Sequence, residues 1–198
     1  MNTALILIDV QQSFVHRPYY QPAPVADFLA RTNALIDGCI RRGIPVVRIL
    51  HVDPPEQADN PFALSSGHVR PIDGLLAFTP AAEFHKTRHS ALVGSGLGVW
   101  LRQNAISRLI IAGIRTEQCC ETTTRHASDE GYEVDYVAEA TLTFDMSNLD
   151  GSPLLAKDII ARTTAVLKDR FATICNVEQA LERATADNPE QQLERVAA

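Results

Sequence analysis

Three side chains of complementary chemistry stand far apart in the chain: Asp9, Lys86 and Cys119. A carboxylate can take the proton of a thiol and later give it to a leaving nitrogen, provided that burial raises its pKa. An ammonium group beside them can hold the resulting charges in place. The sulfur can then add to a carbonyl carbon, and water can release the thioester that forms. Together these residue types predict hydrolysis of a small amide or a related carbon–nitrogen bond.

Taken singly, each of the three residues has a more ordinary explanation. Asp9 ends an apolar run and could simply cap the next turn. Lys86 could be a solvated surface residue, and a buried cysteine often serves only as a small hydrophobe. Cys119 does stand at the first turn of a predicted helix, where free backbone N–H groups and the helix dipole favour a thiolate. The neighbouring Cys120 leaves the choice of nucleophile open on these grounds.

Short β-branched runs alternate with longer amphipathic ones, as in the strand–helix–strand units of a parallel sheet. The sequence therefore predicts an α/β fold with a doubly wound, mostly parallel, six-stranded sheet and helices on both faces. Strands are expected at 4–9, 44–52, 83–85, 108–114, 132–140 and 172–177. Helices are expected at 26–42, after an N-cap at Ser95, and at 117–130, 152–171 and 178–184, with a long loop over 53–80.

This topology would bring the three reactive residues together. Ligands of a doubly wound sheet bind at the carboxyl ends of the strands, where the strand order reverses. Asp9 closes the first strand, Lys86 follows the third, and Cys119 follows the buried strand 108–114. We expect their side chains to meet on one rim of the sheet.

Length and charge narrow the possible partners. The 198 residues suit a single domain, which we expect over residues 1–184, with a polar tail at 185–198. The net charge is −6 and the basic residues are scattered, so the basic stripe that nucleic-acid binding needs is missing. No apolar run reaches the roughly 20 residues of a membrane helix, and the start of the chain does not resemble a signal peptide. We expect a cytoplasmic protein that acts on a small molecule, with no nucleic-acid or membrane partner.

Three stretches of the sequence resemble one known family. LIDVQQSF at the start, HKTRHSALVGSGL in the middle and IAGIRTEQCCETTTRHASDEGYEV later resemble the isochorismatase-like cysteine hydrolases, which include nicotinamidases and N-carbamoylsarcosine amidases. The resemblance spans about residues 4 to 175 and implies the isochorismatase-like hydrolase fold, which is Rossmann-like. It also implies a catalytic triad of Asp9, Lys86 and Cys119, with Cys120 where the family usually has Val.

The resemblance adds expectations about the surroundings of the triad. It implies a non-proline cis peptide between Ile114 and Arg115, which would point the N–H of Arg115 and that of Cys119 at a developing oxyanion. It also implies that Phe14 forms an aromatic wall of the pocket. Family members are commonly dimers or tetramers, so a homodimer or homotetramer is expected.

We expect no metal ion and no cofactor. Nicotinamidases of this family bind a metal through an Asp-x-His after the second strand. This chain has the reversed order, His51-Val52-Asp53, followed by a lone His68, so His51 is interpreted as a hydrogen-bonded residue at a strand end. The glycines at 94, 96 and 98 do not complete a dinucleotide-binding motif, because position 99 is a valine. Three further histidines, His85, His89 and His126, are expected on the surface.

The sequence therefore predicts a cysteine-dependent hydrolase of a small amide, carbamoyl or ureido carbon–nitrogen bond. Two alternatives stay open. One is isochorismatase-type hydrolysis of a vinyl ether, which in related enzymes needs the Asp but not the Cys. The other is a catalytically silent relative that acts as a binding or scaffold module, which an unreactive Cys119 would favour.

Overall fold

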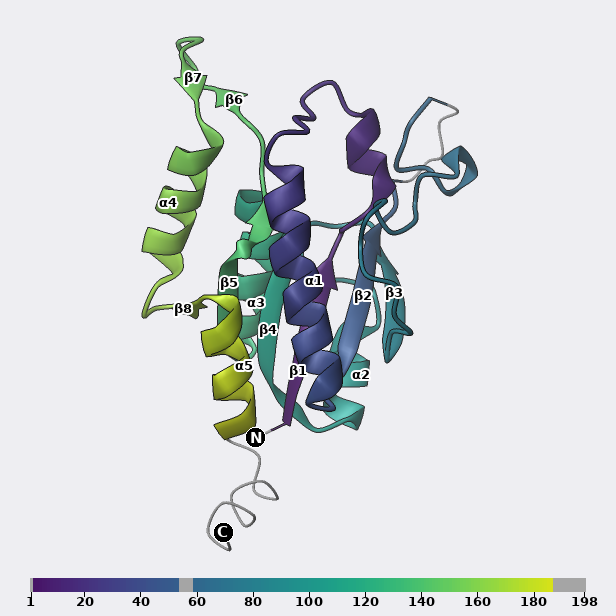
Figure 1. Ribbon diagram of the computed structural model, residues 1–198, viewed down its shortest axis with the longest axis vertical. Coiled ribbons are helices and arrows are strands. Elements are labelled where there is room, and N and C mark those ends of the chain that lie inside the picture. Colours follow the sequence, from purple (N-terminus) through teal and green to yellow (C-terminus); the bar gives the residue numbers. More distant parts are fainter. Residues whose placement is uncertain (1, 54–58, 187–198) are drawn as a thin grey trace, which may run out of the picture.

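Six parallel strands form the centre of the computed structural model, which describes residues 2–53 and 59–186 (Figure 1). The strands lie in the order β3-β2-β1-β4-β5-β8, and every neighbouring pair is parallel. Their bounds are β1 (Asn2–Ile8), β2 (Val46–His51), β3 (Ala82–Lys86), β4 (Ile106–Ile114), β5 (Glu133–Leu142) and β8 (Thr173–Cys175). The predicted fold class is confirmed.

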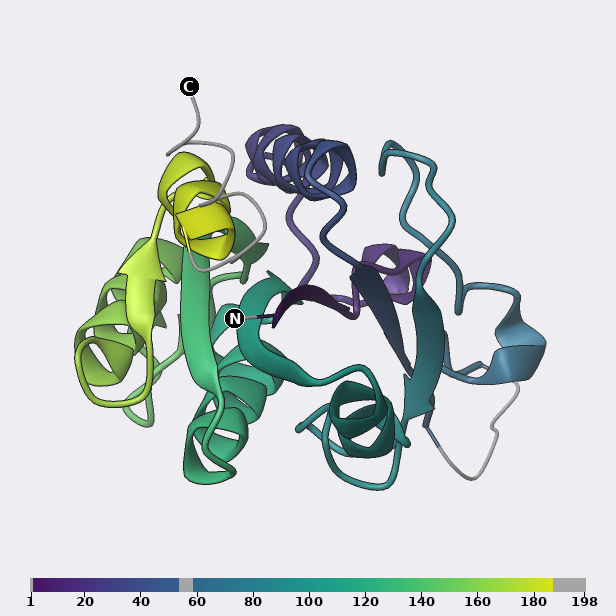
Figure 2. The same ribbon diagram turned by 90° about the horizontal axis from the view of Figure 1, so that it is seen from below.

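Helices cover both faces of this sheet (Figure 2). One face carries α1 (Val25–Arg41) and α5 (Val177–Ala186), and the other carries α2 (Leu97–Gln103), α3 (Glu121–Asp129) and α4 (Ala156–Leu167). Side chains alternate between the faces along a strand, so Leu5 and Leu7 pack in the core under α1, while Ile6 and Ile8 pack in the core on the other side. No helix among the described residues has both the length and the apolar composition needed to cross a bilayer.

The predicted helix at 152–171 was too long at both ends. Its first residues instead belong to a small antiparallel ribbon of β6 (Met146–Ser147) and β7 (Pro153–Leu154), where Pro153 has no N–H to continue a helix. At the other end Asp169 has a left-handed φ of 59°, which turns the chain toward β8. Residues 187–198 of the expected polar tail lie outside the described residues, and α5 ends at Ala186.

Two further helix starts differ from the sequence prediction. Gly96, with a φ of 87°, is the N-cap of α2, and the hydroxyl of Ser95 accepts a hydrogen bond from the N–H of Leu97 at 3.1 Å. The predicted helix at 117–130 begins as a π-turn, η3 (Thr116–Cys120), before α3 takes over. The expected long loop contains the short 3-10 turn η2 (Leu64–Ser66), and its residues 54–58 lie outside the described residues.

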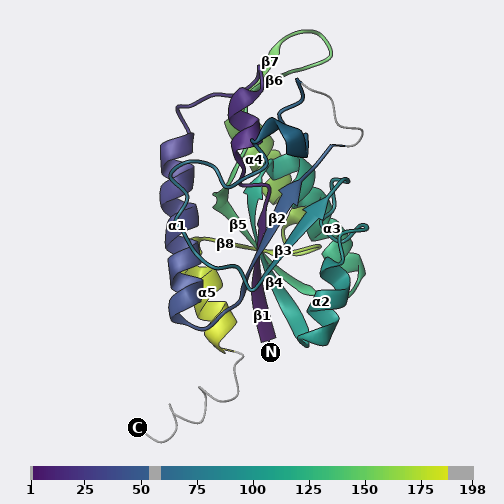
Figure 3. The same ribbon diagram turned by 90° about the vertical axis from the view of Figure 1, so that its right-hand side faces the viewer.

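The strand order reverses between β1 and β4. From β1 the chain steps outward to β2 and β3 and then returns to β4 on the other side of β1. All these strands run toward one edge, beneath the 3-10 turn η1 (Gln12–His16) that follows β1 (Figure 3). This edge is therefore where a doubly wound sheet binds its ligands.

Gly113 allows the two central strands to meet closely at that edge. It pairs with Ile8 across β1 and β4 and has a φ of 136°. A Cβ atom at this position would lie 1.9 Å from the carbonyl oxygen of Ile8. Only glycine fits there, since both the backbone conformation and the contact exclude a side chain.

We predict that Gly113→Ala destabilises the protein by more than about 4 kcal/mol, a loss reserved for severe core or backbone conflicts. Gly131→Ala is the matched control, because Gly131 also has a positive φ, 88°, but open space around it. The Gly131→Ala variant should lose only about 1–2 kcal/mol of unfolding free energy. Urea unfolding measures both variants, and equal losses would contradict the close approach of β1 and β4.

Candidate active site

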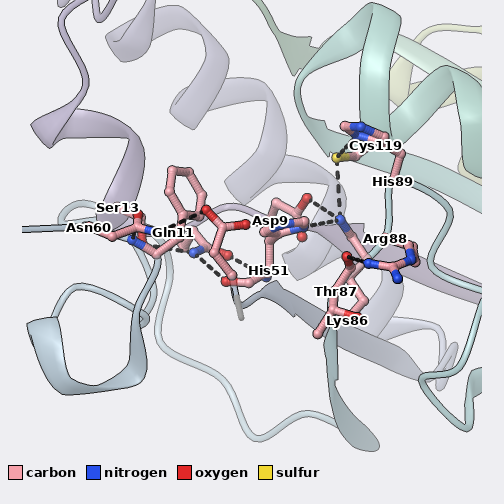
Figure 4. A network of polar contacts seen from close by, with 12 residues as sticks. Asp9, Gln11, Ser13, His51, Asn60, Lys86, Thr87, Arg88, His89 and Cys119 are labelled. Atoms are coloured by element: carbon pink, nitrogen blue, oxygen red, sulfur yellow. Dashed lines mark hydrogen bonds and ion pairs between the residues drawn. The ribbon is translucent and has the colours of Figure 1, made fainter. Parts of the chain in front are cut away.

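Asp9, Lys86 and Cys119 come together at the carboxyl edge of the sheet (Figure 4). Asp9 follows β1, Lys86 ends β3, and Cys119 lies in η3 directly after β4. Lys86 Nζ lies 2.7 Å from Asp9 Oδ2 and 3.3 Å from Cys119 Sγ. The side chains of the ion pair are fully buried, with 0% exposure each. The predicted convergence on one rim is thus present in the structure.

The backbone around Asp9 turns its carboxylate toward β3. Asp9 has a left-handed φ of 53°, a conformation that Asp adopts more readily than most residues. Its N–H donates to the carbonyl of Ile49 at 2.9 Å, which continues the pairing of β1 with β2 by one residue. A carboxylate buried here needs a cation, because leaving a charge unpaired in the interior costs several kcal/mol.

His51 is a further contact of the Lys86 ammonium. Lys86 Nζ lies 3.0 Å from His51 Nδ1, and His51 Nε2 lies 2.8 Å from Asp53 Oδ1. An ammonium only donates hydrogen bonds, so Nδ1 accepts and Nε2 carries the ring proton that it donates to Asp53. Lys86 therefore donates hydrogen bonds to His51 and Cys119 and forms an ion pair with Asp9. This arrangement fixes the orientation of the ammonium.

Gln11 holds His51 in register with the turn after β1. Its Oε1 accepts from the N–H of His51 at 2.7 Å, and its Nε2 donates to the carbonyl of His51 at 3.1 Å. The same amide nitrogen donates to Ser13 Oγ at 2.8 Å. Gln11 is fully buried, so two internal hydrogen bonds join the segment after β1 to the end of β2, and the third holds the Gln11 amide within that segment.

The protonation states follow from these contacts. Burial alone would lower the pKa of Lys86, but the neighbouring Asp9 carboxylate and the Cys119 sulfur raise it above its ordinary value. Burial and then the Lys86 charge lower the pKa of His51, against the opposing effect of Asp9 and Asp53. Lys86 is therefore a cation and His51 a neutral imidazole at neutral pH, as the hydrogen bonds require.

Cys119 rests as a thiol. Burial raises its pKa to about 12, the Asp9 carboxylate raises it as well, and Lys86 acts in the opposite direction. The thiolate expected from a position at a helix start is therefore not the resting form, because loss of hydration outweighs the favourable charges. Asp9 lies beside the thiol as the group that can take its proton.

The two neighbouring cysteines have different surroundings. Cys119 lines a cavity of about 250 Å³ at the carboxyl edge, whereas the lining includes no atom of Cys120 among the described residues. Cys120 has 0% exposure and packs in the core on the α2 and α3 side. Cys119 alone of the pair faces a space that a ligand can enter.

The cavity is small and has aromatic and polar walls. Its lining residues are Asp9, Phe14, Arg17, Tyr19, His51, Asp53, Phe62, His89, Gln118 and Cys119. Phe14 lies where the resemblance implied, and its ring meets that of Phe62 edge to face at 5.1 Å. His89 is exposed, as expected, but it stands at this cavity with Nδ1 3.9 Å from Cys119 Sγ.

Ile114 and Arg115 are joined by a cis peptide bond. Neither residue is among the described residues that line the cavity. The Arg115 side chain instead reaches Glu117, at 3.1 Å, and Thr143, and its guanidinium lies 5.0 Å from the ring centre of Tyr19. The role of the Arg115 N–H in an oxyanion site stays a prediction.

The donor atoms at the site do not fit a metal ion while Lys86 is charged. An oxygen of Asp9, a ring nitrogen of His51 and Sγ of Cys119 lie within 4.8 Å of one another, close enough to share a cation. Lys86 Nζ contacts all three side chains, at 2.7, 3.0 and 3.3 Å. The ammonium is the cation of this cluster, and the second ring nitrogen of His51 is used by Asp53.

The structure places the predicted Asp9, Cys119 and Phe14 at the cavity, but much of the cavity wall was not predicted from the sequence. The sequence analysis assigned no role at the cavity to Arg17, Tyr19 or Gln118, and it interpreted His51 only as a strand-end residue. The signal for His51 and Asp53 was available in their spacing, which was read as a reversed metal motif. His51 instead contacts Lys86, which is 35 residues away in the sequence, and Asp53 contacts His51.

Comparison with known proteins assigns the domain. The isochorismatase domain model matches residues 3–179. The chain is 30% identical over 183 residues to the isochorismatase family protein YrdC of Bacillus subtilis (strain 168), which covers 89% of this chain and 92% of that protein. It is 28% identical over 172 residues to streptothricin hydrolase of Streptomyces noursei, covering 85% of this chain and 57% of that protein. It is 28% identical over 154 residues to nicotinamidase 3 of Arabidopsis thaliana, covering 72% of this chain and 74% of that protein.

Solved structures share the fold. A Chromobacterium violaceum protein assigned to the same family superposes with a TM-score of 0.82 at 24% identity, over 94% of this chain and 95% of that one. N-carbamoylsarcosine amidase from Thermoplasma acidophilum superposes with a TM-score of 0.68 at 20% identity, over 90% of this chain and 98% of that one. The predicted fold is therefore the one that these proteins adopt.

We predict that iodoacetamide alkylates Cys119 more slowly than a free thiol at pH 7.5. The rate should keep rising up to pH 10 without a plateau, because the pKa is about 12 and only the thiolate reacts. Asp9→Asn removes the charge that raises this pKa and should speed alkylation at pH 8.5. Peptide mass spectrometry measures both rates. A plateau below pH 8, or slower alkylation in Asp9→Asn, would contradict the assigned charges.

A second prediction concerns the buried ion pair. Lys86→Met leaves the Asp9 carboxylate without its cation and should cost about 3–5 kcal/mol of unfolding free energy. The double variant Asp9→Asn/Lys86→Met removes both charges and should recover part of that loss. Urea unfolding of the two single variants and the double variant gives the coupling energy, and additive losses would show that the two charges do not interact.

Proposed function

Since this chain belongs to the isochorismatase family of hydrolases, we propose that it hydrolyses a small amide, carbamoyl or ureido carbon–nitrogen bond, with Cys119 as the nucleophile. The observation that carries this proposal is the position of one sulfur. Cys119 Sγ lies on the wall of the cavity and 3.3 Å from the Lys86 ammonium, which is paired with Asp9. A nucleophile and a base thus line one cavity, and a buried positive charge lies in contact with both of them.

The first half of the reaction forms a thioester. Asp9 takes the proton of the Cys119 thiol as the sulfur adds to the carbonyl carbon of the substrate. Lys86 stabilises the negative charge that passes from the carboxylate to the sulfur and then to the oxygen. The intermediate collapses when Asp9 gives its proton to the nitrogen, the carbon–nitrogen bond breaks, and ammonia or an amine leaves.

The second half restores the enzyme. Asp9, again a carboxylate, takes a proton from a water molecule that attacks the thioester carbon. The carbon–sulfur bond then breaks, the acid product leaves, and Asp9 returns the proton to sulfur. The resting thiol of Cys119 suits this cycle, because Asp9 passes the thiol proton to the leaving nitrogen and later replaces it with a proton taken from water.

His51 and Asp53 support the reaction by holding Lys86 in place and take no part in transferring the thiol proton. Neutral His51 accepts from Lys86 and is itself held by Asp53, so the ammonium keeps one orientation when charge moves between Asp9 and Cys119. A protonated His51 could not accept this hydrogen bond and would repel Lys86. We therefore regard His51 as a positioning residue.

The cavity and the relatives point to small substrates. A space of about 250 Å³ lies just below the range of small-molecule pockets, which starts at about 300 Å³. Two relatives carry names that specify small-molecule hydrolysis, a streptothricin hydrolase and a nicotinamidase. At 28% identity they support the class of bond and leave the substrate of this chain to be found by experiment.

We predict that a screen of small amides, carbamoyl compounds and ureido acids, read by ammonia release, finds a substrate of the wild-type protein. Cys119→Ala should lower its turnover by roughly 10³-fold or more, as loss of a nucleophile does in other hydrolases. Cys120→Ala is the matched control, since Cys120 is buried away from the cavity, and should keep turnover within a few-fold. Both variants are checked for folding by circular dichroism.

Three results would redirect the proposal. Activity kept in Cys119→Ala and lost in Cys120→Ala would move the nucleophile. Hydrolysis of isochorismate by both wild type and Cys119→Ala would favour the vinyl ether reaction, which does not need the thiol. No ammonia from any compound, together with no change in ligand binding on Cys119→Ala, would favour a silent binding module. Slow alkylation of Cys119 is not evidence for a silent binding module, because a thiol pKa of about 12 predicts slow alkylation in an active enzyme as well.

A further inference from the structure

Arg17 brings an unused positive charge to the wall of the cavity. It follows η1 directly and is among the residues that line the cavity with Cys119. Its Nε is buried and has no hydrogen-bond partner among the described residues. Its guanidinium carbon lies 5.6 Å from the ring centre of Tyr19. The guanidinium carbon of Arg115 lies 5.0 Å from the centre of the same ring. The guanidinium is therefore held against a fixed ring but is not bound to an anion.

The two carboxylates of the cavity have other partners. Asp9 pairs with Lys86 at 2.7 Å, and Asp53 accepts hydrogen bonds from His51 at 2.8 Å and Asn60 at 3.1 Å. Arg17 is near enough for its charge to contribute to lowering the pKa of Asp53. Yet no ion pair within 4.0 Å joins Arg17 to any residue in the described parts of the chain. A buried donor of a charged group left without an acceptor is costly unless a ligand supplies one.

We propose that Arg17 binds a carboxylate of the substrate, so that this enzyme acts on small carbon–nitrogen compounds that carry a carboxylate group. The inference rests on the proposed function, because it names the substrate class of the same site. A guanidinium presents two parallel N–H donors that match the two oxygens of a carboxylate. Phe14 and Phe62 would then contact the apolar part of the molecule between its carboxylate and the carbonyl at Cys119.

A singly charged carboxylate suits the site better than a phosphate. The cavity wall already includes the negative charge of Asp53, and the Lys86 charge is balanced by Asp9. Arg17 is the only arginine among the described residues that line the cavity. With His51 neutral, the charges of Asp9, Lys86, Asp53 and Arg17 sum to zero. A bound carboxylate therefore adds one negative charge to the site, whereas a phosphate would add two, which the single guanidinium offsets less well.

The inference can be tested without knowing the substrate, by comparing two alkylating reagents at Cys119. Iodoacetate carries a carboxylate and iodoacetamide is its neutral counterpart. We expect the ratio of their rates at Cys119, measured by peptide mass spectrometry at pH 9, to exceed the ratio at the same cysteine in urea-unfolded protein. Arg17→Gln should lower that ratio by about tenfold, the effect of losing roughly one charge-assisted hydrogen bond.

Arg88→Gln is the matched control for this experiment. Arg88 is exposed, lies two residues after Lys86, and donates to the carbonyl of Thr87 at 3.1 Å. It does not belong to the described lining of the cavity, so its loss should change the reagent ratio less than twofold. If both variants lowered the rate ratio equally, the preference for iodoacetate would come from general surface charge, and the inference would be overturned. An unchanged ratio in Arg17→Gln would also overturn it.

A binding measurement decides the case in which the buried thiol reacts with neither reagent. Calorimetry on the Cys119→Ala protein compares succinamate with its methyl ester, which lacks the charge. The acid should bind about tenfold more tightly, and adding Arg17→Gln should remove that difference. Equal binding of acid and ester would contradict a carboxylate site.

The two proposals fail separately. Neither the reagent ratio nor the binding measurement uses hydrolysis. If no compound released ammonia but the alkylation and binding measurements showed a strong preference for the carboxylate form, the proposed reaction would be lost and the carboxylate site at Arg17 would stand. If neutral amides released ammonia and acids showed no advantage, the proposed reaction would stand and the carboxylate site at Arg17 would be lost.

Discussion

The buried ion pair between Asp9 and Lys86 is the interaction on which the rest of this site depends. Both side chains have 0% exposure, and neither charge could remain in the interior without the other. The pair joins β1 to β3 across the intervening β2, whose last residue, His51, contacts the same ammonium at 3.0 Å. Three neighbouring strands thus each contribute one polar group at their carboxyl ends, and the strand on the other side of β1 leads to Cys119. The parallel sheet is what makes four distant stretches of sequence end at one point.

The same constraint explains the charge state of the site. A thiol surrounded by buried groups loses hydration, and its pKa rises to about 12. The adjacent Asp9 carboxylate contributes to this rise, so the sulfur keeps its proton in the resting site. The ammonium opposes this rise, and its contacts with Asp9, His51 and Cys119 hold it in one position. The Cys119 thiol keeps its proton because it is buried, and the neighbouring Asp9 is the base that could remove it.

The fold and the convergence of Asp9, Lys86 and Cys119 could be predicted from the sequence, because both follow from the order of the strands and from residues placed just after strand ends, while the preference for Cys119 over Cys120 came from the family resemblance. Apolar runs of strand length fixed the six strands, and residues just after strand ends are the ones that a doubly wound sheet brings together. The role of His51 could not be derived in this way, since its partner Lys86 is distant in the chain and the pairing depends on the register of β2 with β3. Arg17 and Tyr19 lie after a 3-10 turn that has no periodic signature. The resting thiol was also missed, because a sequence shows where a helix begins but not how deeply its first turn is buried.

The covalent intermediate provides the most direct test of the central claim that sulfur, carboxylate and ammonium act as one unit on a carbonyl carbon. The protein is mixed with a compound from which it releases ammonia, quenched in acid during turnover, and mapped by mass spectrometry. The account predicts an added mass equal to the acyl part of the substrate on Cys119, sensitive to hydroxylamine as a thioester is. Steady turnover with an unmodified Cys119, or with the acyl group on Cys120, would contradict it.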